Sequence, residues 1–308
     1  MKKYSICLMG FGNVGRAFTK LLKRKAKQIE DEFQVSFCIS AISTGNHGWA
    51  IKHSGIQTEK AIEIYSKNGS LEKLSTIPLP DRIRDFITLS EADILLEISP
   101  VNYSSGEPAV THIETALENN MHVVSANKGP VVHAYDRLTA LAREQGKQFL
   151  FESSVMDGAP IFSAFREALP TAKVLGFEGV LNSCTNLLIE KMEQGSSFED
   201  AVTYAQSIGI AETDPSGDID GWDAAIKVAA LITVLMGIPT KPQNINRKGI
   251  RNLDPEMIQQ AINSGKRWKL VCSAEKKNKK ISATVSPRLV SPSSPLFSVN
   301  GTSSFVLF

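Results

Sequence analysis

The fold is decided by Ser5-Ile6-Cys7-Leu8-Met9-Gly10-Phe11-Gly12-Asn13-Val14-Gly15, where an apolar run meets three glycines at GxGxxG spacing. A stretch with helical spacing of apolar residues, 16–29, follows directly. In such a strand, turn and helix, the first glycine permits a tight turn, the second lets backbone N–H groups approach a pyrophosphate, and the third lets the helix pack closely on the strand. The helix N-terminus offers further N–H donors to the phosphates. We therefore predict that Gly10, Phe11, Gly12, Asn13, Val14 and Gly15 bind a dinucleotide.

Short apolar runs alternate with amphipathic stretches throughout the first half of the chain. Strands are expected at 4–9, 35–42, 94–98 and 123–124, and helices at 16–29, 108–120 and 135–145. Strands that alternate with helices indicate a doubly wound parallel sheet. We predict an α/β fold whose Rossmann-type dinucleotide-binding domain covers residues 1–150.

The second half has a different pattern, typical of an α+β domain over residues 151–308. Strands are expected at 149–151 and 174–181, and helices at 198–208 and 221–236. Lys276, Lys277, Lys279 and Lys280 separate two apolar runs, 270–271 and 281–285. This run of charge is most simply a solvated hairpin turn, not a nucleic-acid site.

Composition favours small-molecule partners. The 308 residues carry a formal net charge of only +2, which gives no basic excess for nucleic acid or an anionic membrane. No apolar run approaches the ~20 residues of a membrane span, and no signal-peptide pattern follows Met1, so we expect a cytoplasmic protein. The four cysteines have no metal-ligand spacing and are expected to be buried thiols in a reducing compartment.

The second expected strand ends in Ala41-Ile42-Ser43-Thr44-Gly45-Asn46, which contains no acid. An acid at this point normally binds the ribose 2′-hydroxyl of NAD. A neutral end would not repel a 2′-phosphate, and Lys52 lies a little further on, so NADP is tolerated beside NAD. A simple polar turn explains the same residues equally well.

Two lysines, Lys128 and Lys227, lie in sequence segments that are not typical of lysines on the protein surface. Lys128 follows an expected strand, at the sheet edge where α/β folds bind ligands. Lys227 lies four residues after Asp223 on one helix face, a spacing that alone is typical of a surface ion pair. Its flanks, however, are apolar on almost every side. We therefore expect a partly desolvated Lys227 with a lowered pKa, able to exchange a proton with a substrate alcohol.

These segments together resemble homoserine dehydrogenase over nearly the whole chain. The motifs that carry the resemblance are the glycine turn, 126–130, 152–155, 179–186 and above all 205–227. The resemblance implies a reversible NAD(P)-linked interconversion of L-homoserine and L-aspartate 4-semialdehyde, in threonine and methionine biosynthesis. It also implies that the second domain binds the substrate and forms a homodimer.

The resemblance assigns roles to particular residues. Lys227 would donate and accept the proton beside Asp223, and Lys128 would lie next to the nicotinamide and the substrate. Homoserine would be bound by Glu212, Asp218 and Asp223.

Further cofactor contacts and a cation site also come from the resemblance. Ser99 and Gly209 would border the cofactor. A monovalent cation, sodium, would bind the Glu152 side chain and the backbone carbonyls of Val155, Asp157 and Ala159. A loop or helix-entry hydrogen bond is the alternative role for Glu152.

The chain also departs from the family pattern. Met156-Asp157 replaces part of a glycine-rich stretch, and Asn182-Ser183-Cys184 stands where Asn-Gly-Thr is usual. The family's C-terminal return helix and the regulatory domain of its larger members are not present, so we expect a short or truncated form. A related dehydrogenase for another amino alcohol or semialdehyde, or a non-catalytic dinucleotide-binding partner, are the alternative functions.

Overall fold

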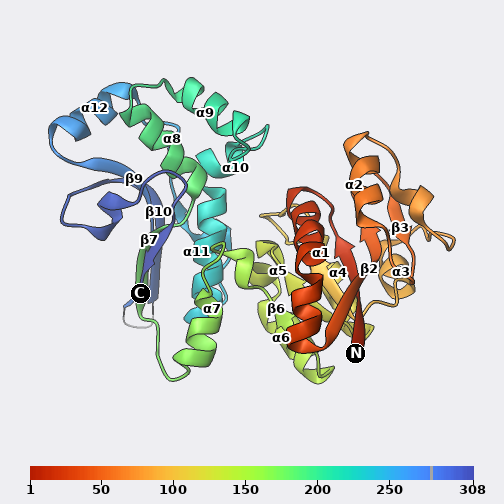
Figure 1. Cartoon of the computed structure of the whole chain (residues 1–308). Helices are drawn as coiled ribbons and strands as arrows, with labels where there is room; N and C mark the ends of the chain where they lie inside the picture. The colour runs from red at the N-terminus through yellow and green to blue at the C-terminus, as the bar shows by residue number, and fades with distance from the viewer. Residues whose placement is uncertain (278–279) are drawn as a thin grey trace. The chain divides into compact units, whose positions relative to one another are not determined.

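The computed structural model describes residues 1–277 and 280–308, which form two compact units, Met1–Ser154 and Val155–Phe308 (Figure 1). The first unit runs from red to yellow-green in Figure 1 and the second from green to blue.

A six-stranded sheet of order β3-β2-β1-β4-β5-β6 forms the centre of the first unit. Its parallel strands are β1 (Lys2–Met9), β2 (Val35–Ser43), β4 (Ile94–Glu97), β5 (His122–Ser125) and β6 (Phe149–Leu150). Only β3 (Trp49–Ile51), at one edge, is antiparallel to its neighbour. This confirms the predicted α/β fold with a doubly wound, mainly parallel sheet.

The helices of the first unit follow the strands as crossovers. They are α1 (Asn13–Phe33), α2 (Thr58–Ser66), α3 (Ile83–Leu89), α4 (Ala109–Glu118), α5 (Lys128–His133) and α6 (Tyr135–Glu144). The strand order places β2 on one side of β1, and β4 and β5 on the other. Because β-α-β crossovers are right-handed, α1 and α4 cover opposite faces of the sheet.

One strand was assigned to the wrong unit. Residues 149–151 were expected in the second domain, but Phe149–Leu150 is β6 and pairs with β5 at the edge of the first sheet. Phe149 also packs on Phe151, with ring centroids 5.0 Å apart. The run is too short for its periodicity to show which sheet it joins, and this depends on the preceding crossover helix α6.

The second unit contains a five-stranded sheet of order β11-β7-β9-β10-β8. Its strands are β7 (Gly176–Val180), β8 (Asn246–Arg247), β9 (Arg267–Lys277), β10 (Lys280–Val290) and β11 (Phe305–Leu307). The pair β8–β10 is parallel, and the other neighbouring strands pair antiparallel. Its helices are α7 (Ile161–Ser163), α8 (Ser183–Glu193), α9 (Phe198–Ser207), α10 (Ser216–Ile219), α11 (Trp222–Leu235) and α12 (Pro255–Asn263), and α8, α11 and α12 contact β9. The predicted α+β character is confirmed.

The lysine-rich segment lies between β9 and β10, which pair antiparallel from Lys277 opposite Lys280 to Arg267 opposite Val290. The two apolar runs, 270–271 and 281–285, therefore lie in the two strands on either side of the predicted turn. The tip of the predicted turn, 278–279, lies outside the described residues.

Helix α11 explains why this unit has a stable core. It is apolar around nearly its whole circumference, and ten of its fourteen residues are buried. Such a helix is stable only when other elements surround it. It begins after Gly221, whose φ of +79° is a left-handed conformation that glycine adopts at little cost.

The glycine turn yields a first prediction, because its first two glycines differ in their surroundings. A Cβ on Gly10, which has φ +113°, would lie 2.7 Å from the Ile98 carbonyl oxygen, whereas a Cβ on Gly12 would meet nothing within 4 Å. We expect Gly10→Ala to lower the free energy of unfolding by about 1–3 kcal/mol. Gly12→Ala is the matched control and should leave it nearly unchanged. Urea denaturation of both variants measures this, and equal stabilities would contradict the assignment.

Candidate functional site

The strand register of the first unit brings four strand ends to one edge of the sheet. Met9 pairs with both Ser43 and Glu97, and Glu97 pairs with Ser125. The residues that follow these strands therefore lie along one carboxyl edge, where open α/β sheets bind ligands. They include the glycine turn, Ser99 and Lys128.

The glycine turn has the geometry that its sequence predicts. Gly10 donates its backbone N–H to Ser43 O (2.9 Å), and a Cβ on Gly15 would lie 2.9 Å from Gly10 O, so the start of α1 is tight against the turn. Gly12, Asn13 and Val14 are exposed, whereas Phe11 is buried. Helix α1 has no acidic residue in its first turn and no side-chain cap on its N-terminus. Its first N–H groups are thus accessible to an anion.

A hydrogen-bonded network positions Ser99 at the same edge. Glu97, fully buried at the end of β4, accepts hydrogen bonds from the Ser99 N–H (2.9 Å) and the Ser99 hydroxyl. Its other oxygen lies 2.7 Å from Nδ1 of the buried His112 on α4. Sequence reasoning missed Glu97 and His112, although an acid inside an otherwise apolar strand is unusual enough to attract attention.

Lys128 begins helix α5, directly after this network. Asn127 caps the helix by accepting a hydrogen bond from Gly129 N–H (2.9 Å), and its amide donates to Ser99 O (3.0 Å). Lys128 is half-buried. Lys128 thus lies at the carboxyl edge, as predicted, directly after Asn127, which hydrogen-bonds to Ser99.

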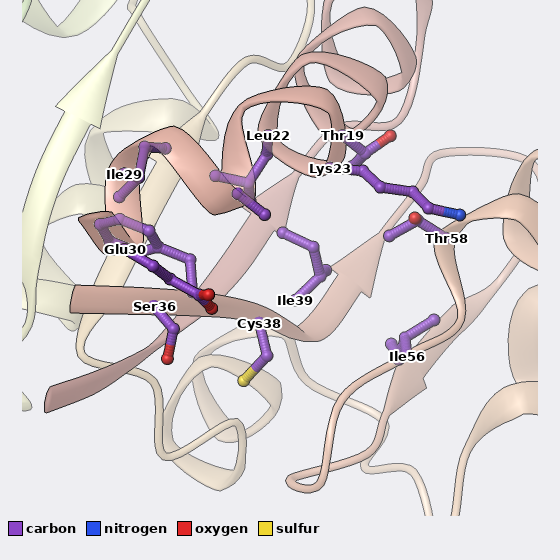
Figure 2. A pocket seen from close by; sticks show the side chains of 12 residues that line it. Thr19, Leu22, Lys23, Ile29, Glu30, Ser36, Cys38, Ile39, Ile56 and Thr58 are labelled. Carbon is purple, nitrogen blue, oxygen red and sulfur yellow. The ribbon is translucent and has the colours of Figure 1, made fainter. Parts of the chain in front are cut away.

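A cavity of about 270 Å³ in this unit lies away from the carboxyl edge (Figure 2). It is lined by one side of α1 from Thr19 to Glu30, by residues 36–39 of β2, and by Ile56 and Thr58. It therefore does not adjoin the glycine turn. Cys38 is only half-buried, which corrects the expectation that all four cysteines are buried; Cys7, Cys184 and Cys272 are buried free thiols.

In the second unit, Lys227 is the centre of a buried polar cluster. Its Nζ lies 3.0 Å from Asp223 Oδ2 and donates to the Leu181 carbonyl (2.8 Å). The two side chains are only 15% and 11% exposed. The burial of Lys227 expected from its apolar flanks is confirmed, and it excludes the surface ion pair that the spacing alone would suggest.

The direction of the Lys227 pKa shift is opposite to our expectation. Burial acts to lower the pKa of Lys227, but the charge and hydrogen bond of Asp223, together with Asp218, outweigh it and raise the pKa above its usual value. The pKa of Asp218 is also raised, by burial first and then by the Asp223 charge. The expectation counted desolvation and gave too little weight to two carboxylates on one ammonium.

Asn182 joins the two carboxylates, and sequence reasoning did not single it out. Its amide Nδ2 donates to Asp218 Oδ1 (2.6 Å) and to Asp223 Oδ2 (2.9 Å). Its Oδ1 accepts from Thr185 N–H (2.7 Å), which caps helix α8. A cap signal was available in the sequence, but the approach of residues 182, 218 and 223 arises only from the tertiary fold.

Two thiols border the cluster. Burial first, and then the nearby Asp218 charge, raise the pKa of the Cys184 thiol. Burial also raises the pKa of Cys272 to about 12, and Lys227 and Asp223 both act on this thiol. Both cysteines are therefore neutral side chains at physiological pH.

Glu212 and Gly209 lie in the segment between α9 and α10, and both are exposed. Within the described part of the chain, the Glu212 carboxylate makes no hydrogen bond or ion pair with the Lys227 cluster, although its backbone carbonyl accepts from Gln206 (3.1 Å). Gly209 has φ +73° and ends the turn after α9. The structure thus brings together Asp218, Asp223 and Lys227, but not Glu212.

The residues expected to bind a cation fall in one short segment. Glu152 is half-buried, Val155 is buried and Asp157 is exposed, whereas the Ala159 carbonyl accepts a hydrogen bond from Ile161 N–H (2.9 Å). Among residues 1–277 and 280–308, no three His, Cys, Asp or Glu side chains are grouped to hold a metal ion.

Over the same residues, no helix is both long and apolar enough to cross a lipid bilayer.

Comparison with known proteins gives consistent results for both units. Residues 10–152 match the family model of the homoserine dehydrogenase NAD-binding domain, and residues 160–308 match that of homoserine dehydrogenase itself. The NAD(+)-dependent homoserine dehydrogenase of Pseudomonas canavaninivorans is 33% identical over 100% of this chain and 88% of its own length. The homoserine dehydrogenase of Methanocaldococcus jannaschii is 35% identical over 98% of this chain and 88% of its own.

Solved structures agree with these matches. A putative homoserine dehydrogenase from Archaeoglobus fulgidus superposes with a TM-score of 0.82 at 26% identity, covering 99% of this chain and 89% of that one. A homoserine dehydrogenase from Thiobacillus denitrificans gives a TM-score of 0.80 at 29% identity, covering 99% and 66%.

The polar cluster yields a second prediction. Asn182→Ala removes both the α8 cap and the amide donor of two buried carboxylates, so we expect a loss of about 2–4 kcal/mol in the free energy of unfolding. Ser197→Ala removes only the cap of α9 and should cost about 1 kcal/mol.

Asn182→Asp separates the two roles of Asn182, because a carboxylate still accepts from Thr185 N–H but adds a third negative charge beside Lys227. NMR titration of the lysine side chains should show a further rise in the Lys227 pKa in this variant and no change in Ser197→Ala. An unchanged Lys227 pKa in Asn182→Asp would refute the proposed coupling.

Proposed function

The chain belongs to the homoserine dehydrogenase family, and on this premise we propose that Lys227 carries the proton transfer between L-homoserine and L-aspartate 4-semialdehyde. The chain is an oxidoreductase with an NAD-binding domain. The observation that carries the proposal is a buried ammonium that contacts one carboxylate and one backbone carbonyl. Its reaction would serve amino-acid biosynthesis.

The chemistry requires residues of these types. Oxidation of a primary alcohol removes a proton from oxygen while a hydride leaves carbon, and NAD, when bound, accepts that hydride. Lys227 exchanges the proton, and Asp223 holds the ammonium in place. Homoserine also carries a cationic amine, for which Glu212 and Asp218 supply negative charge. Lys128, at the carboxyl edge of the NAD-binding domain, acts beside the reacting groups.

The residues present fit a dinucleotide. The exposed Gly12, which has free space around its Cα, and the uncapped α1 N-terminus suit a pyrophosphate. Gly10, Phe11, Asn13, Val14 and Gly15 complete this turn, while Ser99 and Gly209 are further contacts. We propose NAD as one cofactor, as in the P. canavaninivorans enzyme by its name, and NADP as another, because the end of β2 contains no acid.

A monovalent cation, sodium, is proposed for segment 152–159. The oxygen donors would be the Glu152 carboxylate and the carbonyls of Val155, Asp157 and Ala159. A hard cation prefers oxygen ligands, and a site with one carboxylate suits a monovalent cation better than a divalent one. The half-buried position of Glu152 supports this choice.

We also propose that the protein is a homodimer through the second unit. Large apolar side chains are exposed on or beside its sheet, at Leu175, Leu289 and Leu307. Exposed apolar side chains of this kind favour association. Analytical ultracentrifugation gives the oligomeric state directly.

One observation favours a second candidate substrate. Cys184, at a position where the family usually has threonine, lies close enough to Asp218, a proposed substrate ligand, for each group to shift the pKa of the other. A different side chain at this point could admit another amino alcohol or semialdehyde. A substrate panel decides between them, and cofactor binding without turnover of any alcohol would identify a non-catalytic protein.

A third prediction concerns turnover. Purified protein with L-homoserine should reduce NAD or NADP, followed by nicotinamide absorbance. Lys227→Ala should lower kcat about 10²- to 10⁴-fold, because it removes the general base. Lys266→Ala, at an exposed lysine in the same unit, is the matched control and should retain full activity. An unchanged rate in Lys227→Ala would overturn the assignment.

A fourth prediction concerns pH. Homoserine oxidation needs neutral Lys227 to accept the proton, whereas semialdehyde reduction needs its charged form. Because the pKa of Lys227 is raised above its usual value of 10.5, kcat for oxidation should still increase with pH near 10, while kcat for reduction should stay level through neutral pH.

The same pH profile has an internal control. Asp223→Asn removes the charge that raises the Lys227 pKa, so the rise in oxidation kcat should move to lower pH. A profile that stays in place in Asp223→Asn would show that another group titrates.

A further inference from the structure

Arg16, in the first turn of α1, lies beside the segment that follows β2. Its guanidinium carbon lies 4.4 Å from the centroid of the Tyr65 ring on α2. The Tyr65 ring in turn packs against the His47 ring, with centroids 4.3 Å apart. His47 donates its backbone N–H to the Thr44 hydroxyl, just after the end of β2. A chain of three contacts thus links the Arg16 side chain to the end of the second strand.

Arg16 is held in place but keeps its charge available. One terminal nitrogen donates to Asn13 Oδ1 (2.7 Å), and the planar group stacks on Tyr65, so the side chain is preorganised. Arg16 is half-buried, and within the described part of the chain no carboxylate pairs with it. A fixed guanidinium without an acidic partner suits bidentate binding of a phosphate.

The end of β2 is neutral where a dinucleotide-binding strand usually carries an acid. Ser43 and Thr44 are almost fully buried, and the next two residues, Gly45 and Asn46, are exposed. In the related NAD folds an acid here binds the ribose 2′-hydroxyl, and an arginine nearby accommodates a 2′-phosphate. This chain lacks the first and has the second.

The basic residue expected at this point from sequence, Lys52, is less well placed. It follows β3, which is antiparallel to β2, and its backbone N–H donates to Ser40 O (2.8 Å). Ser40 lies three residues before the end of β2, which is about 10 Å along a strand. Lys52 therefore begins well behind the carboxyl edge.

We propose that Arg16, supported by Tyr65 and Asn13, binds the 2′-phosphate of NADP and gives this chain its use of that cofactor. This rests on the proposed use of dinucleotides by the first unit. The ligand class is an adenosine nucleotide with a phosphate on the ribose 2′-oxygen.

The test uses the full chain and two fragments of the cofactors, adenosine 2′,5′-bisphosphate and 5′-ADP. Calorimetry should show tighter binding of the 2′,5′-bisphosphate to the unchanged protein. Arg16→Ala should weaken binding of the 2′,5′-bisphosphate at least about tenfold, because a charge-assisted hydrogen bond is lost, and should leave the affinity for 5′-ADP nearly unchanged. Arg24→Ala, an exposed arginine of the same helix, is the matched control and should keep both affinities.

A second variant tests the charge at the strand end. Gly45→Asp introduces the missing acid at an exposed position where a Cβ meets nothing within 4 Å, so the fold should be preserved. It should weaken the 2′,5′-bisphosphate and not 5′-ADP. In the homoserine assay, both variants should lower kcat/KM for NADP selectively, with NAD little affected.

Several results would overturn the proposal. Equal affinity of the unchanged protein for the two fragments would overturn it. An equal loss of affinity for both fragments in Arg16→Ala would also overturn it, because Arg16 would then bind the pyrophosphate. Loss of the preference in Lys52→Ala but not in Arg16→Ala would assign the site to Lys52. Because binding needs no turnover, a protein that prefers the 2′-phosphate but does not oxidise homoserine would contradict only the proposed function.

Discussion

The buried ammonium of Lys227 is the constraint around which the second unit is organised. An isolated charge in a protein interior costs several kcal/mol, so it needs compensation from every side. Asp223 compensates from one turn earlier on the same helix, and the Leu181 carbonyl from the residue just after β7. The two carboxylates would repel one another, and the shared amide of Asn182 offsets this by donating to both. The start of α8, the start of α11 and the end of β7 are therefore held together by one charge.

The first unit follows a different rule, since its site is made by the backbone. Parallel register aligns the ends of β1, β2, β4 and β5, and the side chains beyond them need only short polar loops to reach a ligand. Glu97 and Asn127 fix these loops by hydrogen bonds to the backbone of Ser99. The close approach of Gly10 to the Ile98 carbonyl leaves no room for a side chain. Glycine is thus required at position 10 by packing as well as by the positive φ of the turn.

The sequence predicted the helices and strands better than it predicted the tertiary contacts between them. Periodicity and the GxGxxG spacing located α1, α9, α11 and the central strands, because local patterns determine them. The prediction failed for Phe149–Leu150, because the preceding crossover determines which sheet this strand joins. It also failed for the direction of the Lys227 pKa shift, because the effect of burial is outweighed first by Asp223 and then by Asp218. Asn182, Glu97 and His112 were missed because each acts on residues 15 or more positions distant. Such contacts leave no periodic trace in a single sequence.

The upward shift of the Lys227 pKa changes how the site should be understood. A lysine with a lowered pKa would be a ready base, suited to taking the alcohol proton at neutral pH. Two nearby carboxylates instead keep this lysine charged at neutral pH. In the proposed reaction, the charged ammonium is the form that would donate a proton to the aldehyde oxygen, so the raised pKa would suit reduction of the semialdehyde at neutral pH. Bringing a cationic substrate amine close to the same carboxylates would weaken their hold on Lys227, so substrate binding itself would make proton release easier.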